Sequence, residues 1–77
     1  MIGKMLKYMR NSKRLKQIDL AKQLNIAQTT LSGYETQYSN ADFATIEKIA
    51  ELCDFEIIFR NKITKEEFTV ETIERKD

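Results

Sequence analysis

Histidine is absent from the 77-residue sequence, and the only cysteine is Cys53. Without histidine, a His-based catalytic triad and a zinc site are both excluded, and we expect no metal and no other cofactor. A single cysteine cannot form an internal disulfide, which is typical of proteins in a reducing compartment. These absences predict a cytoplasmic protein.

The chain also lacks proline, has only two glycines, and contains no apolar run as long as a membrane span. Its start does not resemble a secretory signal. A hydrophobic content of 42% with mixed charge predicts one small folded domain with a modest core. No glycine-rich phosphate loop occurs, and Cys53 falls on an apolar stripe where a buried structural thiol is expected. We therefore expect no enzymatic activity.

Charge is unevenly distributed along the chain. Residues 1–38 hold seven basic and two acidic side chains, a net +5, whereas residues 39–77 hold six basic and ten acidic ones, a net −4. Such asymmetry predicts a basic end that meets a polyanion and an acidic end that does not. The alternative is a chance imbalance among solvated helix faces.

Apolar residues recur at helical spacing in four segments. The first, in residues 2–14, is expected to end near Lys13, and the second and third cover residues 17–24 and 28–35. Asn25 between them tolerates the left-handed conformation that a helix stop often needs. Asp42 is a good N-cap for the fourth segment, residues 43–53. The sequence thus predicts a mainly α fold, with four helices in the first two-thirds of the chain.

After Asp54 the apolar period changes from helical to alternating. Residues 55–60 and 67–72 read as two strands, and the polar residues 61–66 between them have the size of a hairpin turn. We therefore expect a C-terminal β-hairpin after the four helices, with residues 1–54 and 55–77 as two parts of one domain.

The second and third segments are too short to be stable alone, so they must pack on other helices and present an exposed face rigidly. At the start of the third segment the outward side chains are expected to be Gln28, Thr29, Ser32 and Gly33. Glutamine can bond an adenine edge in two places, and a threonine methyl can touch a thymine methyl. This face is suited to a DNA major groove.

From Leu6 to Asp54 the sequence resembles the Cro and phage-repressor type of helix-turn-helix, the XRE family with its lambda-repressor-like bundle. The residues that carry the resemblance are spread through LKQIDLAKQLNIAQTTLSGYE and the later AELC segment: Gln17, Leu20, Ala21, Ile26, Leu31, Glu35, Ala50 and Cys53. The resemblance implies a sequence-specific regulator of transcription that binds double-stranded DNA in the nucleoid.

Roles for individual residues also follow from the resemblance. It implies that Gln28, Thr29, Ser32 and Gly33 face bases. It implies that Lys16, Gln17, Thr36 and Tyr38 lie near phosphates, where the N-terminus of a helix favours an anion. It further implies a structural ion pair between Arg10 and Glu35. Ordinary structural readings stay open for Gln17, as a polar helix start, and for Thr36 and Tyr38, as plain loop residues.

Some positions depart from the family pattern. Asn25 and Gln37 stand where glycine is common, so the turn and the exit from the third helix are expected to be strained or shifted. Ala27 replaces the usual serine or threonine N-cap, at a cost of about 1 kcal/mol. Gly33 leaves one reading position without a side chain.

Apolar side chains occupy both faces of the first predicted strand, because Ile57, Ile58 and Phe59 are consecutive. A two-stranded hairpin is marginal by itself and must pack on the helices, on another chain, or on both. We expect a homodimer on a palindromic operator, with an interface made by Ile57, Ile58, Phe59, Phe68 and Val70. The alternative is that Ile58 merely lies on a partly exposed face.

Two other functions remain open at the level of sequence. The same helix-turn-helix serves as the antitoxin of toxin–antitoxin pairs, whose protein partner the sequence does not identify. The second alternative is a protein-interaction module that has lost DNA binding, although the basic charge of residues 1–38 favours DNA binding over this alternative. The leading prediction is a dimeric repressor that occupies a promoter.

Overall fold

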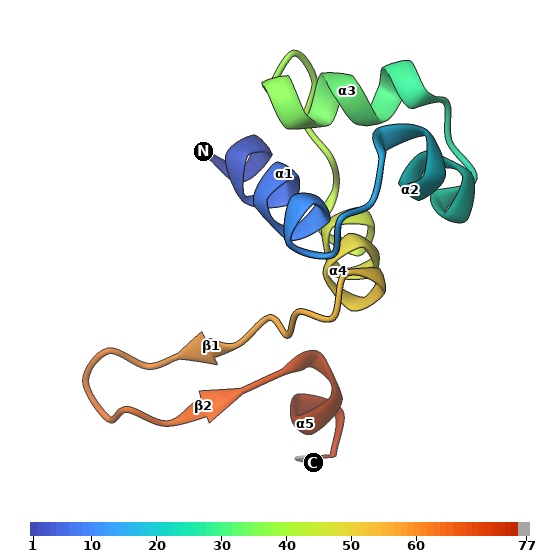
Figure 1. Ribbon diagram of the computed structural model, residues 1–77. Helices are drawn as coiled ribbons and strands as arrows, with labels where there is room; N and C mark the ends of the chain where they lie inside the picture. The colour runs from blue at the N-terminus through green and yellow to red at the C-terminus, as the bar shows by residue number, and fades with distance from the viewer. Residues whose placement is uncertain (76–77) are drawn as a thin grey trace.

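The computed structural model describes residues 1–75, and the last two residues of the predicted 55–77 segment, Lys76 and Asp77, lie outside the described residues. Four helices come first: α1 (Ile2–Ser12), α2 (Gln17–Leu24), α3 (Gln28–Thr36) and α4 (Phe43–Leu52). An antiparallel pair of strands, β1 (Phe59–Arg60) and β2 (Glu67–Phe68), and a short helix, α5 (Val70–Glu74), follow. Figure 1 shows the four helices as a bundle from which the hairpin projects. The predicted four-helix architecture with a C-terminal hairpin is confirmed.

One core joins the four helices. Leu6 of α1, Leu20 of α2, Leu31 of α3 and Ile49 of α4 are each fully buried and belong to a single cluster. Ala21, also buried, is small enough to let α3 approach α2 closely. The short helices α2 and α3, with 8 and 9 residues, owe their stability to this packing, because isolated helices of that length are marginal in water.

Helix ends follow the local sequence. The Asp42 side chain caps α4 by accepting a hydrogen bond from the Thr45 N–H at 2.8 Å. Asn25 and Gln37, which end α2 and α3, adopt left-handed backbone conformations with φ of 58° and 64°. These are the two positions at which the family resemblance leads one to expect glycine but the sequence has another residue. The expected strain is therefore present, because both residues carry the cost of a left-handed conformation.

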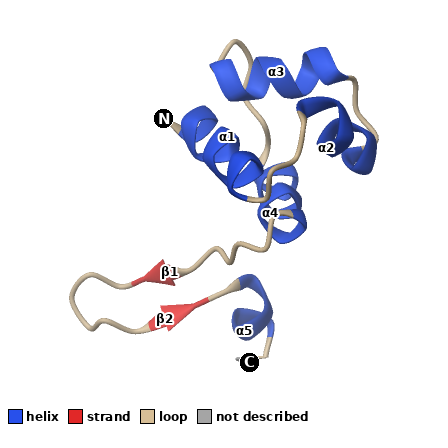
Figure 2. Ribbon diagram, in the orientation of Figure 1, coloured by secondary structure: helices blue, strands red, loops and turns tan. Residues whose placement is uncertain are grey.

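The prediction of a second strand over residues 67–72 is wrong beyond Phe68. Residues 70–74 form α5 because Thr69 and Thr72 make a capping box, in which each side chain bonds the other residue's backbone N–H. Alternation of apolar residues over 67–72 therefore does not continue the hairpin, and Val70 belongs to a helix (Figure 2). The predicted turn at residues 61–66 is present: the Asn61 carboxamide oxygen accepts from the N–H groups of Ile63 and Thr64.

The start of α1 lies against the end of α3. At Gly3 a Cβ atom would come within 2.5 Å of the Glu35 carbonyl oxygen and 2.7 Å of the Tyr34 carbonyl oxygen. Only glycine allows this approach. The same junction is tied by the Gln37 Oε1 atom, which accepts a hydrogen bond from the Gly3 N–H at 2.7 Å. Within residues 1–75, no helix is long and apolar enough to cross a membrane.

Candidate nucleic-acid interface

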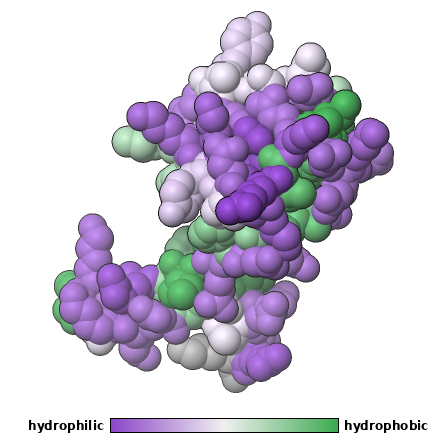
Figure 3. All heavy atoms as spheres, viewed as in Figure 1, coloured by the Kyte–Doolittle hydropathy of each residue, from purple (hydrophilic) through white to green (hydrophobic). Residues whose placement is uncertain are grey.

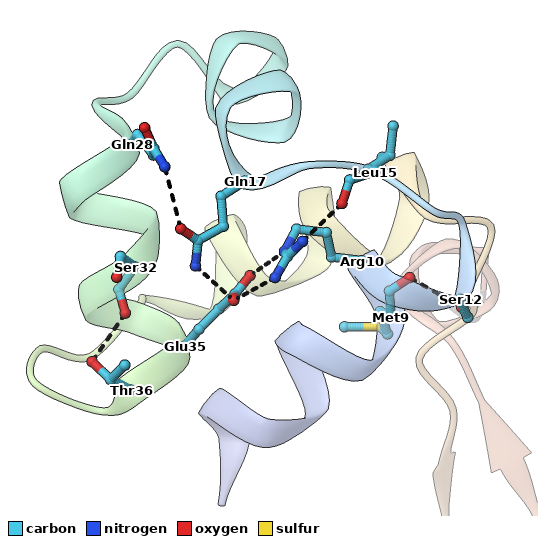
Figure 4. Close-up of polar contacts among 9 residues, drawn as sticks. All are labelled: Met9, Arg10, Ser12, Leu15, Gln17, Gln28, Ser32, Glu35 and Thr36. Carbon is cyan, nitrogen blue, oxygen red and sulfur yellow. Dashed lines mark hydrogen bonds and ion pairs between the residues drawn. The ribbon is translucent and has the colours of Figure 1, made fainter.

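Two glutamines stand at the N-termini of α2 and α3 and face each other. Gln17 is the first residue of α2 and Gln28 the first residue of α3. The Gln28 Nε2 atom donates to Gln17 Oε1 at 3.5 Å, a weak contact, and Gln17 Nε2 donates to Glu35 Oε1 at 3.0 Å (Figure 4). The orientation of the Gln17 amide is thus set from inside the domain, and Gln28 keeps an oxygen and a second N–H free to bond elsewhere.

An ion pair buried between α1 and α3 supports these amides. Arg10 Nε lies 2.6 Å from Glu35 Oε2 and Arg10 Nη2 lies 3.0 Å from Glu35 Oε1, so the contact is bidentate. Arg10 Nη1 also donates to the Leu15 carbonyl at 2.8 Å, which ties down the loop that enters α2. A single chain of hydrogen bonds therefore runs from the backbone before α2 to the exposed Gln28 side chain (Figure 4).

The titration of the pair follows from these contacts. The hydrogen bond to Glu35 raises the pKa of Arg10 above its ordinary value, although burial opposes the shift. Burial alone would raise the pKa of Glu35, but hydrogen bonds from Arg10 and Gln17 outweigh it and lower the pKa below its ordinary value. Both groups are consequently charged at neutral pH, and the carboxylate is an acceptor for every donor aimed at it.

The predicted base-reading residues differ in their surroundings. Gln28 and Thr29 are exposed at the start of α3, and Ser32 is half-buried one turn later. Gly33 is placed differently: a Cβ at this position would lie 3.0 Å from Ser39 Oγ, and its carbonyl accepts from the Ser39 N–H at 3.2 Å. Gly33 therefore faces the loop after α3, which leaves Gln28, Thr29 and Ser32 as the outward side chains.

The predicted phosphate-contacting residues also divide. Lys16, just before α2, is exposed, and Tyr38 is 91% exposed in the loop after α3. The Thr36 hydroxyl donates back to the Ser32 carbonyl at 3.0 Å, so its proton is already used within α3 (Figure 4). Thr36 could contact a phosphate only by giving up this bond.

Sequence reasoning did not find the role of Gln37. The glutamine is visible in the sequence only as a replacement for a common glycine, yet its side chain caps the first turn of α1 through the Gly3 N–H. It thereby fixes the start of the loop that carries Tyr38 and Ser39. Nothing local marks this contact, because the two residues are 34 positions apart.

The residues predicted for a dimer interface lie mostly on the projecting hairpin. Ile58, Phe59 and Phe68 are exposed, Ile57 and Val70 are half-buried, and the rings of Phe59 and Phe68 stack with centroids 5.4 Å apart. Val70, in α5, shares a pocket with Ala50 of α4 and is displaced from the strands. Figure 3 shows apolar surface at the waist between the bundle and the hairpin.

Cys53, the lone thiol, lies in the core just after α4 with 3% of its surface exposed. Burial raises the pKa of this thiol, which disfavours the reactive thiolate. Its environment is that of a packing residue.

Comparison with known proteins gives one match. The model of the helix-turn-helix family HTH_3 matches residues 6–59, which span α1 to the beginning of β1. Neither the comparison with curated proteins nor that with solved structures finds a match. The matched range contains the glutamine pair, the buried ion pair and the exposed start of α3.

Proposed function

Since the chain belongs to the helix-turn-helix family HTH_3, of the XRE (Cro) type, and is a DNA-binding regulator, we propose that it is a sequence-specific repressor that acts as a homodimer in the cytoplasm. Each copy inserts α3 into the major groove of double-stranded DNA. The dimer occupies a palindromic operator and blocks the promoter there.

The observation that carries this proposal is the hydrogen-bonded chain from Arg10 through Glu35 and Gln17 to Gln28. Support before DNA arrives favours a base-reading side chain, because ordering that side chain on binding reduces affinity, and Gln17 gives Gln28 a weak support of this kind at 3.5 Å. Gln28 has an amide oxygen and one N–H left over, which is the set that an adenine edge requires. Thr29 beside it offers a methyl group for a thymine.

Contacts to the DNA backbone fit the ends of the same helices. Gln17 lies at the N-terminus of α2, where unpaired N–H groups and the helix dipole favour a phosphate. Lys16, just before α2, and Tyr38, in the loop after α3, are both exposed. Charge supports this assignment, because residues 1–38 carry net +5. Thr36 is a secondary candidate, and Gly33 contributes by admitting the loop that holds Tyr38.

Dimerisation follows from the small footprint of one reading helix. A single helix-turn-helix contacts few base pairs, and two copies spaced one DNA turn apart, about 34 Å, multiply the specificity. Ile57, Ile58, Phe59 and Phe68 provide an apolar surface for the second copy, with Val70 at its border.

Selection from a pool of random duplex DNA, followed by sequencing and by affinity measurements against salt, tests the proposal. We expect a palindromic site with half-sites one turn apart, and an affinity that falls steeply as salt rises, because phosphate contacts release counterions. No enriched sequence, or binding indifferent to salt, would overturn the proposal in favour of a protein-interaction module.

A further inference from the structure

The outer edge of β1 is open. The Asn61 N–H, just beyond β1, donates to the Glu66 carbonyl at 2.8 Å, and Phe59 in β1 pairs with Phe68, so both residues turn their polar backbone groups toward the second arm of the hairpin. In an antiparallel ladder this direction alternates, which turns the backbone groups of Arg60 to the other side, and the same alternation continued by one residue before β1 does so for Ile58. Residues 56–58 precede the ladder, and the described part of the chain offers their backbone groups no backbone hydrogen-bond partner.

An apolar groove of about 760 Å³ runs beside this edge. Its walls come from α1, from the start of α4 and from residues 55–59. In Figure 1, β2 lies on one side of β1, and α1 and α4 lie on the other. The rims remain open to solvent although they are apolar: Met5 and Tyr8 of α1 are 56% and 68% exposed, and Phe43 of α4 is 46% exposed.

We propose that this groove receives residues 56–60 of a second copy of the chain, which lead into and form β1, antiparallel to the first copy and centred on Ile58, so that the two hairpins form one four-stranded sheet. The inference rests on the dimeric part of the proposed function and names the surface and the register that produce it. Backbone hydrogen bonds along a free edge supply affinity in such strand addition, and alternate side chains supply specificity.

Charge complementarity selects the register. In this register Ile58 lies opposite Ile58 of the partner subunit, and Glu56 lies opposite Arg60 of the partner subunit. The two-fold axis generates a second, equivalent pair between Arg60 and Glu56 of the partner subunit. In the single chain, Arg60 has only a loose contact of 3.7 Å with Glu67, and both side chains are exposed. Opposite charges across neighbouring strands stabilise pairing.

Neighbouring registers are less favourable. A shift of two residues either way keeps the backbone groups aligned but sets Glu56 or Arg60 opposite an isoleucine. The charged residues that would replace the lost partners, Asp54 and Lys62, lie outside the pairing segment 55–60, because Asp54 has a left-handed backbone and Lys62 lies in the hairpin turn.

The proposed register also covers the apolar side chains. Phe55 contacts Tyr8 of α1, and Phe59 contacts Phe43 of α4, so odd-numbered residues of this segment face the bundle. Ile57 would meet Phe59 of the partner subunit on that face, within the groove. Ile58, 49% exposed in the single chain, would meet its own symmetry mate on the opposite face.

A charge-reversal series tests the pairing by sedimentation at micromolar concentrations. Glu56→Arg and Arg60→Glu each place like charges opposite one another twice per dimer, and we expect each to raise the dimer dissociation constant roughly tenfold or more. The double variant Glu56→Arg/Arg60→Glu restores both pairs and should recover most of the loss. Lys62→Glu, the same charge change outside the strand, should leave association unchanged. A double variant no better than the single ones overturns the register.

Disulfide trapping tests the register independently. In a hydrogen-bonded antiparallel pair the Cα atoms are about 5.5 Å apart, within the range for a disulfide. Oxidised Ile58→Cys should therefore become a covalent dimer readily, whereas Ile63→Cys at the hairpin tip, although 89% exposed, should not. Equal trapping at both positions, or a wild type that sediments as a monomer, overturns the inference.

DNA binding measured on the same samples separates this inference from the proposed function. A monomeric wild type that still binds a selected duplex overturns the strand pairing alone. A wild type that forms the charge-dependent dimer but binds no duplex supports the pairing and overturns the repressor proposal. Thermal unfolding followed by circular dichroism identifies any variant that has lost its fold.

Discussion

Glu35 accepts hydrogen bonds from Arg10 Nε and Nη2 at 2.6 and 3.0 Å, and both residues are buried between α1 and α3. The carboxylate also accepts a hydrogen bond from Gln17 Nε2, and Gln17 in turn contacts Gln28. Stability of the bundle and orientation of the exposed amides therefore depend on one buried group.

Arg10→Met should destabilise the domain far more than Lys7→Met. Removing one member of a buried ion pair leaves the other charge unpaired, which typically costs about 3–5 kcal/mol, whereas Lys7 is exposed. Thermal unfolding of the two variants measures the difference. The double variant Arg10→Met/Glu35→Leu should regain much of the loss, since it leaves no unpaired charge. Equal melting temperatures for the two single variants would remove the structural role of Arg10.

Stability should fall in acid partly through Glu35. Its folded-state pKa lies below the ordinary value of 4.5, so above that pH the carboxylate adds stability in full. As pH falls below about 4.5 the unfolded state takes up the proton first, and the contribution is lost through the folded pKa. Denaturant unfolding from pH 7 to pH 3 should show the wild-type advantage over Glu35→Gln shrinking only below that point. Asp42, whose pKa is also lowered by Thr45, is present in both proteins and cancels. A constant advantage would contradict the assignment.

Gly3→Ala should cost about 1–3 kcal/mol, because the added methyl group meets two backbone carbonyls that cannot move independently. Gly33→Ala is the matched control. Its methyl group would lie 3.0 Å from the Ser39 hydroxyl, a side-chain end that can rotate away, and 4.0 Å from the Tyr38 ring, and alanine favours a helix over glycine, so the change should be close to neutral. Chemical denaturation of both variants checks the contrast, and a Gly3→Ala protein as stable as wild type would refute the close approach.

Gln37 offers a test that separates backbone strain from capping. Gln37→Ala keeps the left-handed conformation and loses the hydrogen bond to the Gly3 N–H, at a cost of about 1 kcal/mol. Gln37→Gly loses the same bond but relieves a left-handed cost of about 1 kcal/mol, so it should be close to wild type. Melting temperatures that rank alanine above glycine would contradict this account.

Most of the bundle could be predicted from the sequence because its signals are local. Apolar spacing marks the four helices, Asp42 marks the start of α4, and Asn25 marks the end of α2. The helix at the end of the chain could not be predicted in this way, since the alternation of apolar residues over 67–72 also fits a strand. Reciprocal bonds between Thr69 and Thr72 decide for a helix there.

Around the candidate site, too, some features could be predicted from the sequence and others could not. Exposure of Gln28 and Thr29 follows from helical periodicity, and the sequence resemblance implied the ion pair of Arg10 with Glu35. Two tertiary contacts carry no local signal: the Gln37 cap on α1, and the 2.7 Å ion pair of Lys13 with Asp54, two residues 41 positions apart. The placement of Gly33 against Ser39 likewise depends on the path of the loop after α3.

Operator recognition depends on base reading by the exposed start of α3. Repeating the random-duplex selection with Gln28→Ala tests it most directly. We predict that the enriched palindrome relaxes at one position in each half-site, and that affinity for the wild-type site falls by the roughly 1–3 kcal/mol that one bidentate base contact provides. An unchanged enriched sequence with unchanged affinity would contradict the claim that Gln28 reads DNA.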